Sequence, residues 1–306
     1  MSSIKSLIQI PDLTALEVES VLTHAVDFLP QNLEKTLSTR TQSSGNHVVG
    51  LVFFESSTRT RMSFEMAALR TGRKSILFDG SRGTSLEKGE TFLDTLLNIA
   101  AMGPDILVIR APDTLDMIDV SKKINIPILN AGWGKLEHPS QALLDIFTIY
   151  EKRKINLERR PERLLFVGDV KHSRVVGSHI QLSRILNYEI AFCGPQNFIP
   201  LETDIPYFSS LEEGLAWSTS VMLLRVQKER HESSSDLREY ISKYSLNDEH
   251  LKKLKKDQWI LHPGPVNQGV EMNENVYTDF RSLILDQVSH GVALRAALLD
   301  YFLENK

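Results

Sequence analysis

The stretch HVVGLVFFESSTRTRMSFEMAALRTG, residues 47–72, carries the strongest local indication of the fold. It begins with a run of valine, leucine and phenylalanine that is typical of a buried β-strand. It ends with apolar side chains at helical spacing, which predicts an amphipathic helix. The hydroxyl and arginine residues SSTRT, 56–60, therefore lie where a strand ends and a helix begins.

The same alternation continues along the chain. Further apolar runs typical of strands occur at 74–79, 105–111, 126–132, 164–170, 188–194, 220–226 and 259–265. Helical patterns at 89–103 and 114–124 separate the first of these runs, so we predict parallel strands covered by helices. The expected fold class is α/β, with two doubly wound parallel-sheet domains. We expect an active-site cleft between them, because open parallel sheets collect reactive groups beyond the carboxyl ends of their strands.

The polar segment KINLERRPER, 154–163, separates the two series of strands and predicts a domain boundary near residue 152. We therefore expect a first domain at 1–152 and a second domain at 153–287. The last stretch, 282–305, is typical of one or two amphipathic helices, and its pattern alone does not assign it to either domain.

Composition narrows the class of protein. The 306 residues, 42% of them hydrophobic, are enough to bury a large core. A net charge of -4 without a long basic block argues against nucleic acid as a partner. The N-terminal segment lacks the features of a signal peptide and no apolar run reaches membrane-spanning length, so we expect no membrane association. The single cysteine, Cys193, excludes an internal disulfide framework, fits a reducing cytoplasm and is expected to be a buried apolar residue.

The SSTRT segment has the composition of an anion site. At the start of a helix, the hydroxyls of Ser57, Thr58 and Thr60 face the same point as the free backbone N–H groups and the positive helix end. Arg59 adds a planar fork of donors suited to phosphate oxygens. A structural helix N-cap would also explain the hydroxyls, and the residues alone leave both interpretations open. Further arginines on the same segment are expected to be solvated or structural charges: Arg61, Arg70 and Arg73.

Other candidate residues also follow predicted strands. Arg110 closes one of them, although a lone arginine there is usually an ordinary surface charge. His138, followed by Pro139, opens a helix whose positive end favours a neutral imidazole that donates one hydrogen bond to a carbonyl oxygen, although a structural role also suits a lone histidine. The second half offers another polar group: Arg174, Arg225, Gln227, Lys228 and Arg230. Several cations facing one cleft indicate a polyanionic ligand or a pair of ligands.

These stretches, in this order and spacing, resemble the catalytic chains of the aspartate transcarbamoylases, also called aspartate carbamoyltransferases. The resemblance covers nearly the whole length and is carried by FFESSTRTRMSFE (53–65), TSLEKGETFLDT (84–95), HPSQALLDIFTI (138–149), GDVKHSR (168–174), RVQKER (225–230) and HPGPVNQGVE (262–271). It implies transfer of a carbamoyl group from carbamoyl phosphate to L-aspartate, giving N-carbamoyl-L-aspartate and phosphate, in the second step of de novo pyrimidine (UMP) biosynthesis. It also implies no cofactor and no metal.

The resemblance assigns to carbamoyl phosphate the residues Ser57, Thr58, Arg59, Thr60, Arg110, His138, Gln141 and Ser85. Among them, Thr60, Arg110 and His138 would converge on the carbonyl oxygen, where negative charge grows as the amine attacks. Gln141 would bind the carbamoyl amide nitrogen. To aspartate the resemblance assigns Lys88, Arg174, Arg225, Gln227, Gly264 and Pro265. The residues that it implicates in catalysis are Arg59, Thr60, Arg110, His138 and Lys88.

Ser85 and Lys88 belong to the polar loop DGSRGTSLEKGE, 79–90, which without the resemblance would be a flexible connector. In the family such residues reach the active site of a neighbouring subunit, so the resemblance implies a homotrimer with shared active sites. It allows regulatory chains or a dihydroorotase as further partners. It also assigns carbamoyl phosphate to the first domain, completed by C-terminal helices at about 288–306, and aspartate to the second domain. No covalent nucleophile is required, because orientation and electrostatics would suffice and the departing phosphate could take the proton of the amine.

Two stretches depart from the family pattern. WGKLE at 133–137 replaces a small polar segment next to His138, so Trp133 and Glu137 could shift the imidazole or alter the subunit contact. VNQGVE at 266–271 lacks a basic residue of some relatives, which leaves aspartate binding more dependent on the arginines of the second domain.

Two other functions remain open at this point. Ornithine transcarbamoylase shares the STRT half but uses HCLP and SMG segments for its second substrate, where this chain has HPGP and RVQKER. Arginines suit a dicarboxylate and repel a diamino acid. A non-catalytic scaffold or regulatory subunit with this fold would have lost phosphate-site residues, and these residues are intact.

Overall fold

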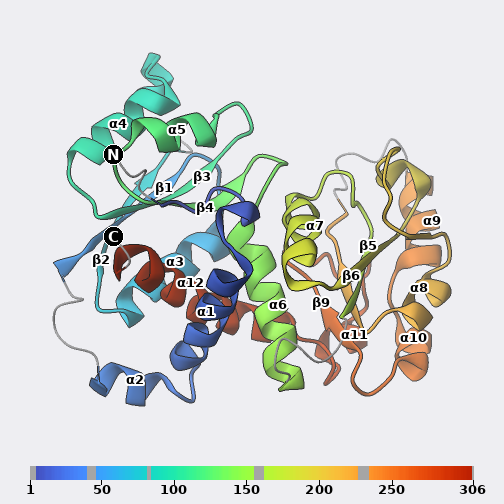
Figure 1. Ribbon diagram of the computed structural model, residues 1–306. Helices are drawn as coiled ribbons and strands as arrows, with labels where there is room; N and C mark the ends of the chain where they lie inside the picture. The colour runs from blue at the N-terminus through green and yellow to red at the C-terminus, as the bar shows by residue number, and fades with distance from the viewer. Residues whose placement is uncertain (1–4, 40–45, 81–83, 155–161, 227–233, 305–306) are drawn as a thin grey trace. The chain divides into compact units, whose positions relative to one another are not determined.

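The computed structural model describes residues 5–39, 46–80, 84–154, 162–226 and 234–304 (Figure 1). Contacts within the chain group it into two compact units, which we call unit 1 (Met1–Leu144 with Val288–Lys306) and unit 2 (Asp145–Gln287). Each unit contains one parallel β-sheet flanked by helices, which confirms the predicted α/β class.

The predicted boundary near residue 152 falls at the end of helix α6 (Pro139–Arg153), whereas the contacts divide that helix after Leu144. On the unit 2 side of this division, Asp145 forms hydrogen bonds with His179 and Gln287, which both belong to unit 2.

Unit 1 is built on a four-stranded parallel sheet in the order β2-β1-β3-β4. Its strands are β1 (Val48–Phe53), β2 (Lys74–Asp79), β3 (Ile106–Ala111) and β4 (Ile128–Trp133). The inner strands β1 and β3 are buried almost throughout, as expected for apolar runs in a parallel sheet covered on both faces. β2 is an edge strand whose residues are half-buried or exposed even where they are apolar.

Helices cover both faces of this sheet. Apart from the start of α6, the α-helices described for unit 1 are α1 (Ala15–Ala25), α2 (Leu33–Thr39), α3 (Thr58–Arg70), α4 (Phe92–Ala101), α5 (Met117–Lys123) and the C-terminal α12 (Ile284–Glu304). Of these, α2 lies away from the sheet (Figure 1). α4 and α5 share an apolar cluster with one face of the sheet, and α3 and α12 lie on the other face (Figure 1). The predicted C-terminal helices are therefore a single helix, which belongs to unit 1 from Val288 onward.

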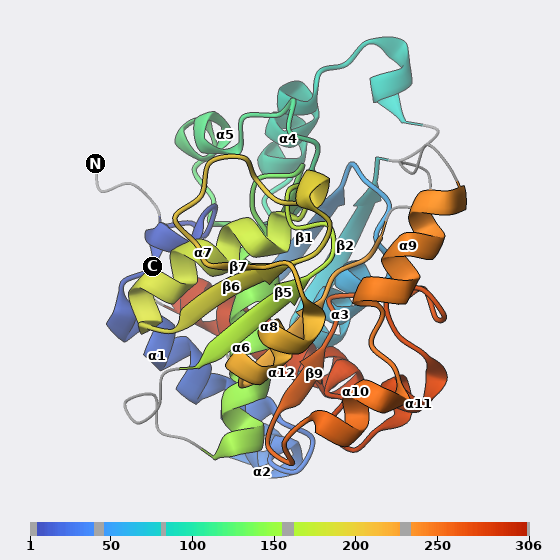
Figure 2. The same cartoon turned by 90° about the vertical axis from the view of Figure 1, so that its right-hand side faces the viewer.

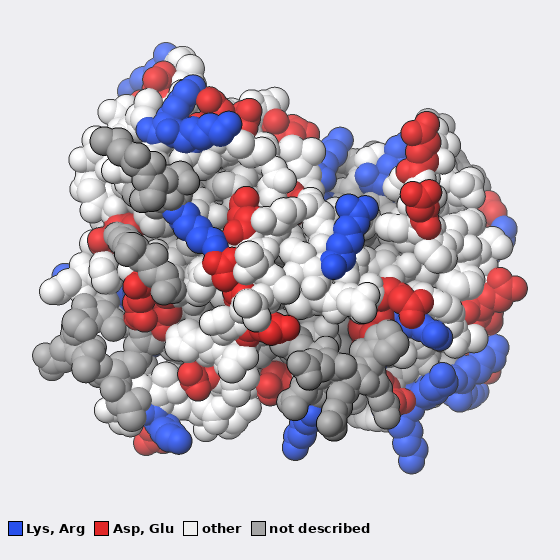
Figure 3. Space-filling view, in the orientation of Figure 1, with Lys and Arg blue, Asp and Glu red and all other residues white. Residues whose placement is uncertain are grey.

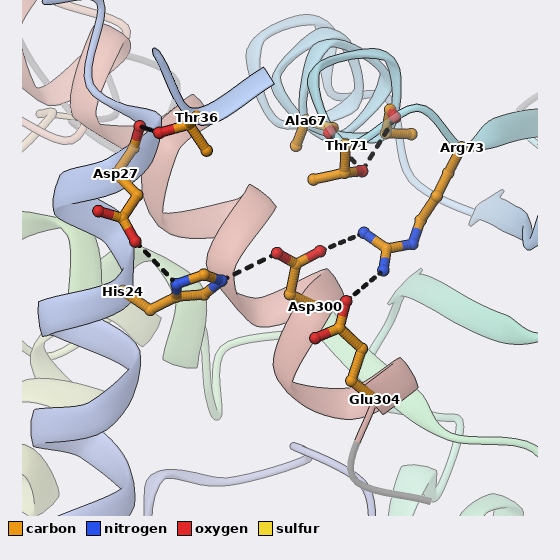
Figure 4. Close-up of polar contacts among 9 residues, drawn as sticks. His24, Asp27, Thr36, Ala67, Thr71, Arg73, Asp300 and Glu304 are labelled. Carbon is orange, nitrogen blue, oxygen red and sulfur yellow. Dashed lines mark hydrogen bonds and ion pairs between the residues drawn. The ribbon is translucent and has the colours of Figure 1, made fainter. Parts of the chain in front are cut away.

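Polar contacts tie α12 to the rest of unit 1 (Figure 4). Asp300 is 2% exposed and accepts hydrogen bonds from His24 of α1, at 2.9 Å, and from Arg73, just after α3. The other ring nitrogen of His24 lies 3.2 Å from Asp27, and Arg73 also pairs with Glu304. Arg73 is thus a buried structural charge, one of the two roles expected for it, and nearby carboxylates compensate the burial of its guanidinium.

Unit 2 contains a five-stranded parallel sheet in the order β7-β6-β5-β8-β9 (Figure 2). Its strands are β5 (Arg163–Val167), β6 (Glu189–Cys193), β7 (Tyr207–Phe208), β8 (Ser220–Leu223) and β9 (Trp259–Leu261). The central strands are apolar and buried, as in unit 1. Cys193 is fully buried in the core, which confirms its expected apolar role.

The helices of unit 2 also cover both faces of its sheet. They are α7 (Arg174–Leu186), α8 (Leu211–Trp217), α9 (Ser234–Tyr244), α10 (Asp248–Lys253) and α11 (Glu274–Thr278). α7 lies on one face, where the His179 ring contacts Phe166 of β5, and α8 to α10 lie on the other face (Figure 1). Both units therefore expose the carboxyl ends of their strands as an edge from which loops lead into helices.

The surface is mixed in charge. On the face shown in Figure 3, basic and acidic side chains are interspersed rather than gathered into one large basic patch. None of the described helices combines the length and the apolar composition needed to cross a membrane. Within the described part of the chain, no three or more His, Cys, Asp and Glu side chains are grouped so as to hold a metal ion.

Candidate functional site

The SSTRT segment lies at the carboxyl end of β1, where the chain turns into α3. Ser57 occupies the N-cap position, but its side chain makes no capping hydrogen bond, so capping alone does not explain this residue. The first turn of α3 holds no acidic residue that would neutralise its positive end. Thr58 and Arg59 are exposed and Thr60 is buried. The turn thus combines hydroxyls, a guanidinium and the N–H groups of a helix start.

Arg110 lies beside this turn because β3 pairs with β1. The strand register places Arg110 opposite Phe53, the last residue of β1, and the Arg110 carbonyl accepts a hydrogen bond from the Phe54 N–H at 2.9 Å. The guanidinium of Arg110 donates to the Ala131 carbonyl at 3.5 Å and lies 3.5 Å from a Glu55 oxygen. The structure therefore brings the SSTRT segment and Arg110 to one edge of the sheet.

His138 and Gln141 follow β4, which is the neighbour of β3 in the sheet. The connection turns sharply at Gly134, where φ is +46° and a Cβ would lie 2.5 Å from the Asp113 nitrogen, so only glycine fits. α6 then begins at Pro139, as predicted from the suitability of proline for a first helical turn. His138 and Gln141 are 5% and 9% exposed. They bring a buried imidazole and a buried amide to the start of α6.

Unit 2 places its candidates at the ends of adjacent strands. Arg174 begins α7 after β5, Arg225 follows β8, and the turn at Gly264 and Pro265 follows β9. Because β5, β8 and β9 are parallel neighbours, these residues share the carboxyl edge of the sheet. Arg225 is exposed and Arg174 is half-buried. The remaining candidates of this group lie outside the described residues: Gln227, Lys228 and Arg230.

Ser85 and Lys88 lie elsewhere in unit 1. They form a short 3-10 helix, Ser85–Lys88, that precedes α4, and Leu86 packs against the apolar cluster shared by α4 and α5. Lys88 is exposed. Figure 2 shows this turn standing out from the rest of unit 1. The segment therefore has a defined local structure and is more than the flexible connector that its composition suggests.

Known proteins share this arrangement over nearly the whole chain. Residues 5–151 match the carbamoyl-P binding domain of aspartate/ornithine carbamoyltransferases, and residues 162–302 match the Asp/Orn binding domain. One relative, the aspartate carbamoyltransferase catalytic subunit of Pelagibacter ubique (strain HTCC1062), is 39% identical over 306 residues, covering 98% of this chain and 96% of the relative. The chain belongs to the aspartate/ornithine carbamoyltransferase family.

Solved structures of carbamoyltransferases agree in fold. The catalytic subunit of M. jannaschii aspartate transcarbamoylase is 27% identical, covers 99% of both chains and superposes with a TM-score of 0.82. Aspartate transcarbamoylase from Trypanosoma cruzi, solved in complex with carbamoyl aspartate and phosphate, is 25% identical and covers 97% of this chain and 95% of that chain, with a TM-score of 0.81. The resemblance to aspartate transcarbamoylase chains is thus confirmed.

Trp133, which departs from the carbamoyltransferase family pattern, is buried in the core of unit 1. Its side chain is 6% exposed and packs in the apolar cluster that includes Leu115 and Met117. The indole N–H donates to the Leu115 carbonyl at 2.7 Å. The backbone N–H of Trp133 donates to the Glu137 carbonyl at 2.9 Å, which closes the connection just before His138.

Buried polar groups of unit 2 were missed by the sequence reasoning. Asp145 and His179 are fully buried with 3.2 Å between their polar atoms. Gln287 donates to Asp145 at 2.7 Å and accepts from the His262 N–H at 2.9 Å. His262 Nδ1 in turn accepts from the Gly264 N–H at 2.8 Å. This carbamoyltransferase therefore supports its Gly264 turn with partners from distant helices, which no local motif could indicate.

Proposed function

We propose that this chain is an aspartate carbamoyltransferase, which transfers the carbamoyl group of carbamoyl phosphate to the amino group of L-aspartate and gives N-carbamoyl-L-aspartate and phosphate. The observation that carries the carbamoyl transfer is the gathering of the Arg59 turn, Arg110 and His138 at the carboxyl ends of β1, β3 and β4. The choice of aspartate rests on Arg174 and Arg225 at the carboxyl edge of unit 2. The family and the name of the 39% identical relative support the same reaction. The reaction is a step of pyrimidine biosynthesis, the second on the de novo route to UMP, and we assign it to the cytoplasm.

Unit 1 binds carbamoyl phosphate. The phosphate accepts hydrogen bonds from the hydroxyls of Ser57 and Thr58, from the guanidinium of Arg59 and from the N–H groups at the start of α3. Ser85 adds a hydroxyl from a neighbouring subunit. The absence of an acidic residue from the first turn of α3 supports this role, because a carboxylate there would repel the phosphate.

The carbamoyl group lies against donors from α3, from the end of β3 and from the connection that follows β4. Thr60, Arg110 and His138 donate hydrogen bonds to its carbonyl oxygen, where negative charge grows during attack. The donors are held in advance by burial or by backbone contacts, since Thr60 and His138 are 8% and 5% exposed. Gln141 accepts a hydrogen bond from the carbamoyl amide. Such preorganised donors lower the barrier because they need no rearrangement as the charge appears.

Unit 2 binds aspartate. Arg174, Arg225 and Gln227 hold its two carboxylates, and Lys88 of a neighbouring subunit adds a further cation. Because the Gly264 N–H already donates to His262, the backbone group that Gly264 offers the substrate amine is its carbonyl oxygen, next to Pro265. The amine nitrogen then forms a bond to the carbamoyl carbon, the bond from that carbon to the phosphate oxygen breaks, and the departing phosphate takes the proton of the amine.

Ornithine is the competing second substrate, because the family includes ornithine carbamoyltransferases. Exposed Arg225 and half-buried Arg174 at the carboxyl edge favour a dicarboxylate, since a second ammonium would meet like charges there. The test is to supply purified protein with carbamoyl phosphate and equal concentrations of aspartate and ornithine. Mass spectrometry should detect carbamoyl-aspartate alone. Citrulline would reverse the assignment, and the absence of both products would favour a non-catalytic scaffold.

We further infer that the active form is a homotrimer. Unit 1 carries an apolar surface on the edge strand β2, where Ile76 is 67% exposed, and on α3, where Met62, Met66 and Leu69 are 54%, 42% and 64% exposed. In a monomer, an exposed apolar edge strand is open to pairing with other chains and promotes aggregation. We propose that a second copy of the chain covers this apolar surface. The proposed role of Lys88 in the site of a neighbouring subunit requires that unit 1 of one chain contacts another chain.

Hybrid trimers test the sharing of sites. Arg59→Ala and Lys88→Ala chains should each be nearly inactive alone. In a ring of three subunits each interface is heterologous, so one site combines the body of one chain with the loop of the next. After mixing in equal amounts and reassembly, about one site in four pairs an intact body with an intact loop, so activity should recover to about that fraction. Hybrid trimers verified by native mass spectrometry but without recovery would place Lys88 outside a neighbour's site.

A further inference from the structure

Glu271 is a fully buried carboxylate in unit 2, with an exposed fraction of 0%. A buried carboxylate is stable only when several donors satisfy it. Its Oε1 accepts hydrogen bonds from the Val226 N–H at 2.8 Å and from Asn267 Nδ2 at 2.9 Å. Its Oε2 accepts from the Asn267 N–H at 2.6 Å. One side chain therefore binds the main chain of two segments that are distant in sequence.

Both segments carry groups assigned above to aspartate. Val226 is the residue after Arg225, in the segment that follows β8. Asn267 lies in the segment that follows β9, after the Gly264 turn. Asn267 Nδ2 also donates to the Val226 carbonyl at 3.2 Å, so the segments are joined to each other as well as to the carboxylate. Glu271 and Asn267 together fix the separation between the main chain at Arg225 and the Gly264 turn.

The imidazole of His262 completes this arrangement. Because His262 Nδ1 accepts the Gly264 N–H, the proton of the neutral ring belongs on Nε2. Nε2 lies 3.8 Å from Oε2 of Glu271, so the N–H dipole favours the ionised carboxylate. Burial raises the pKa of Glu271 above its ordinary value, and the hydrogen bonds from Val226 and Asn267 oppose that rise.

We propose that Glu271 is a positioning residue for aspartate binding. By holding Val226 and Asn267 it sets Arg225 and Gly264 at the separation that the carboxylate and amino ends of one substrate require. The inference rests on the proposed function and extends it to a residue that does not touch the substrate, since donors from the protein occupy both carboxylate oxygens. The effect on catalysis acts through the geometry of the aspartate site.

The substitution Glu271→Gln tests this role. It replaces one carboxylate oxygen with an amide that cannot accept, so either the Val226 or the Asn267 N–H loses its partner. We expect the KM for aspartate to rise about tenfold, the effect of losing one hydrogen bond to a charged group, while the KM for carbamoyl phosphate and kcat stay within about twofold. Glu274→Gln, the same change at an exposed residue nearby, is the matched control and should keep the parent values.

Asn267→Ala is the second variant, and it tests the positioning role of Glu271 if Glu271→Gln does not fold. It removes the side-chain links to Glu271 and Val226 but keeps the Asn267 N–H, so a smaller rise in the same KM is expected. Parent KM for aspartate in the folded variants, or equal losses for both substrates, would overturn the proposal. A parent protein that forms no carbamoyl-aspartate would refute the proposed function instead, and this result is known before any variant is made.

Discussion

The two units place their candidate residues at the same kind of location, the carboxyl edge of a parallel sheet, but they assemble them differently. In unit 1 the segment Ser57–Thr60 combines hydroxyls, a guanidinium and a helix start within one turn. In unit 2 the candidate groups follow β5, β8 and β9 separately, and buried Glu271 joins two of these segments. An anion site can thus be local where a helix start supplies donors, whereas isolated arginines require buried polar support.

The largest expected effect concerns the local site of unit 1. Arg59→Ala should lower kcat/KM about 100-fold, because it removes the charge-assisted contact to phosphate that we propose for this guanidinium. Since Arg59 is exposed, the thermal midpoint of unfolding should change little. The assay is carbamoyl-aspartate formation at varied carbamoyl phosphate.

Arg61→Ala is the control, because Arg61 lies on the same helix but pairs with Asp79 at 3.1 Å on the surface. It should retain nearly the parent activity. A parent value of kcat/KM for Arg59→Ala would contradict the assignment of the phosphate to the SSTRT turn.

The corresponding test in unit 2 is Arg225→Ala. Loss of the guanidinium that we propose to bind a carboxylate of aspartate should raise the KM for aspartate about 10- to 100-fold and leave the affinity for carbamoyl phosphate unchanged. Arg238→Ala removes an exposed arginine of α9 and serves as the control. Titration of each substrate by calorimetry would separate the effects. Comparable losses for both ligands would contradict the assignment of one substrate to each unit.

The same difference explains how much the sequence could reveal. The run 74–79 is predicted as a strand and forms β2 with those bounds, because a short apolar run bounded by polar residues is typical of a strand. Arg59 could be singled out because its neighbours in sequence are also its neighbours in the candidate site. Glu271 could not, since Val226 is 45 positions away and only the folded sheet brings the two together. The two-residue strand β7 was missed because it is too short to show a pattern.

A smaller effect is expected in the rate at which a thiol reagent labels Cys193, which reports which ligand stabilises unit 2. Cys193 is fully buried in the unit 2 core, and burial raises the pKa of its thiol to about 12, so a thiol reagent should label it only after local opening. Carbamoyl phosphate alone should leave the labelling rate unchanged. Carbamoyl phosphate with succinate, a dicarboxylate without the amine, should slow labelling about tenfold at ten times its Kd. Equal protection by carbamoyl phosphate alone would show that this ligand also stabilises unit 2.

The smallest effect concerns the contacts that hold α12 in unit 1, where His24 lies between Asp300 and Asp27. The hydrogen bond with Asp300 raises the pKa of His24 above its ordinary value of 6.5, although burial opposes the rise. A raised folded-state pKa means that the folded protein binds the proton more tightly than the unfolded chain. The added stability is therefore complete below about pH 6.5 and is lost as the pH rises through the folded-state pKa.

The measurement is the free energy of unfolding by urea between pH 5.5 and 8.5, compared between the parent and His24→Gln. Glutamine keeps one donor for Asp300 but cannot carry a charge, so the parent should exceed the variant most at the acidic end, and the difference should shrink toward pH 8.5. Asp300→Asn is unsuitable as the only comparison, because it also removes the partner of buried Arg73. Thr23→Ala, beside His24 on α1, is the control and should give a difference that does not vary with pH. A difference between parent and His24→Gln that stays constant across this range would show that His24 contributes to unit 1 by packing against Phe28 rather than through its charge.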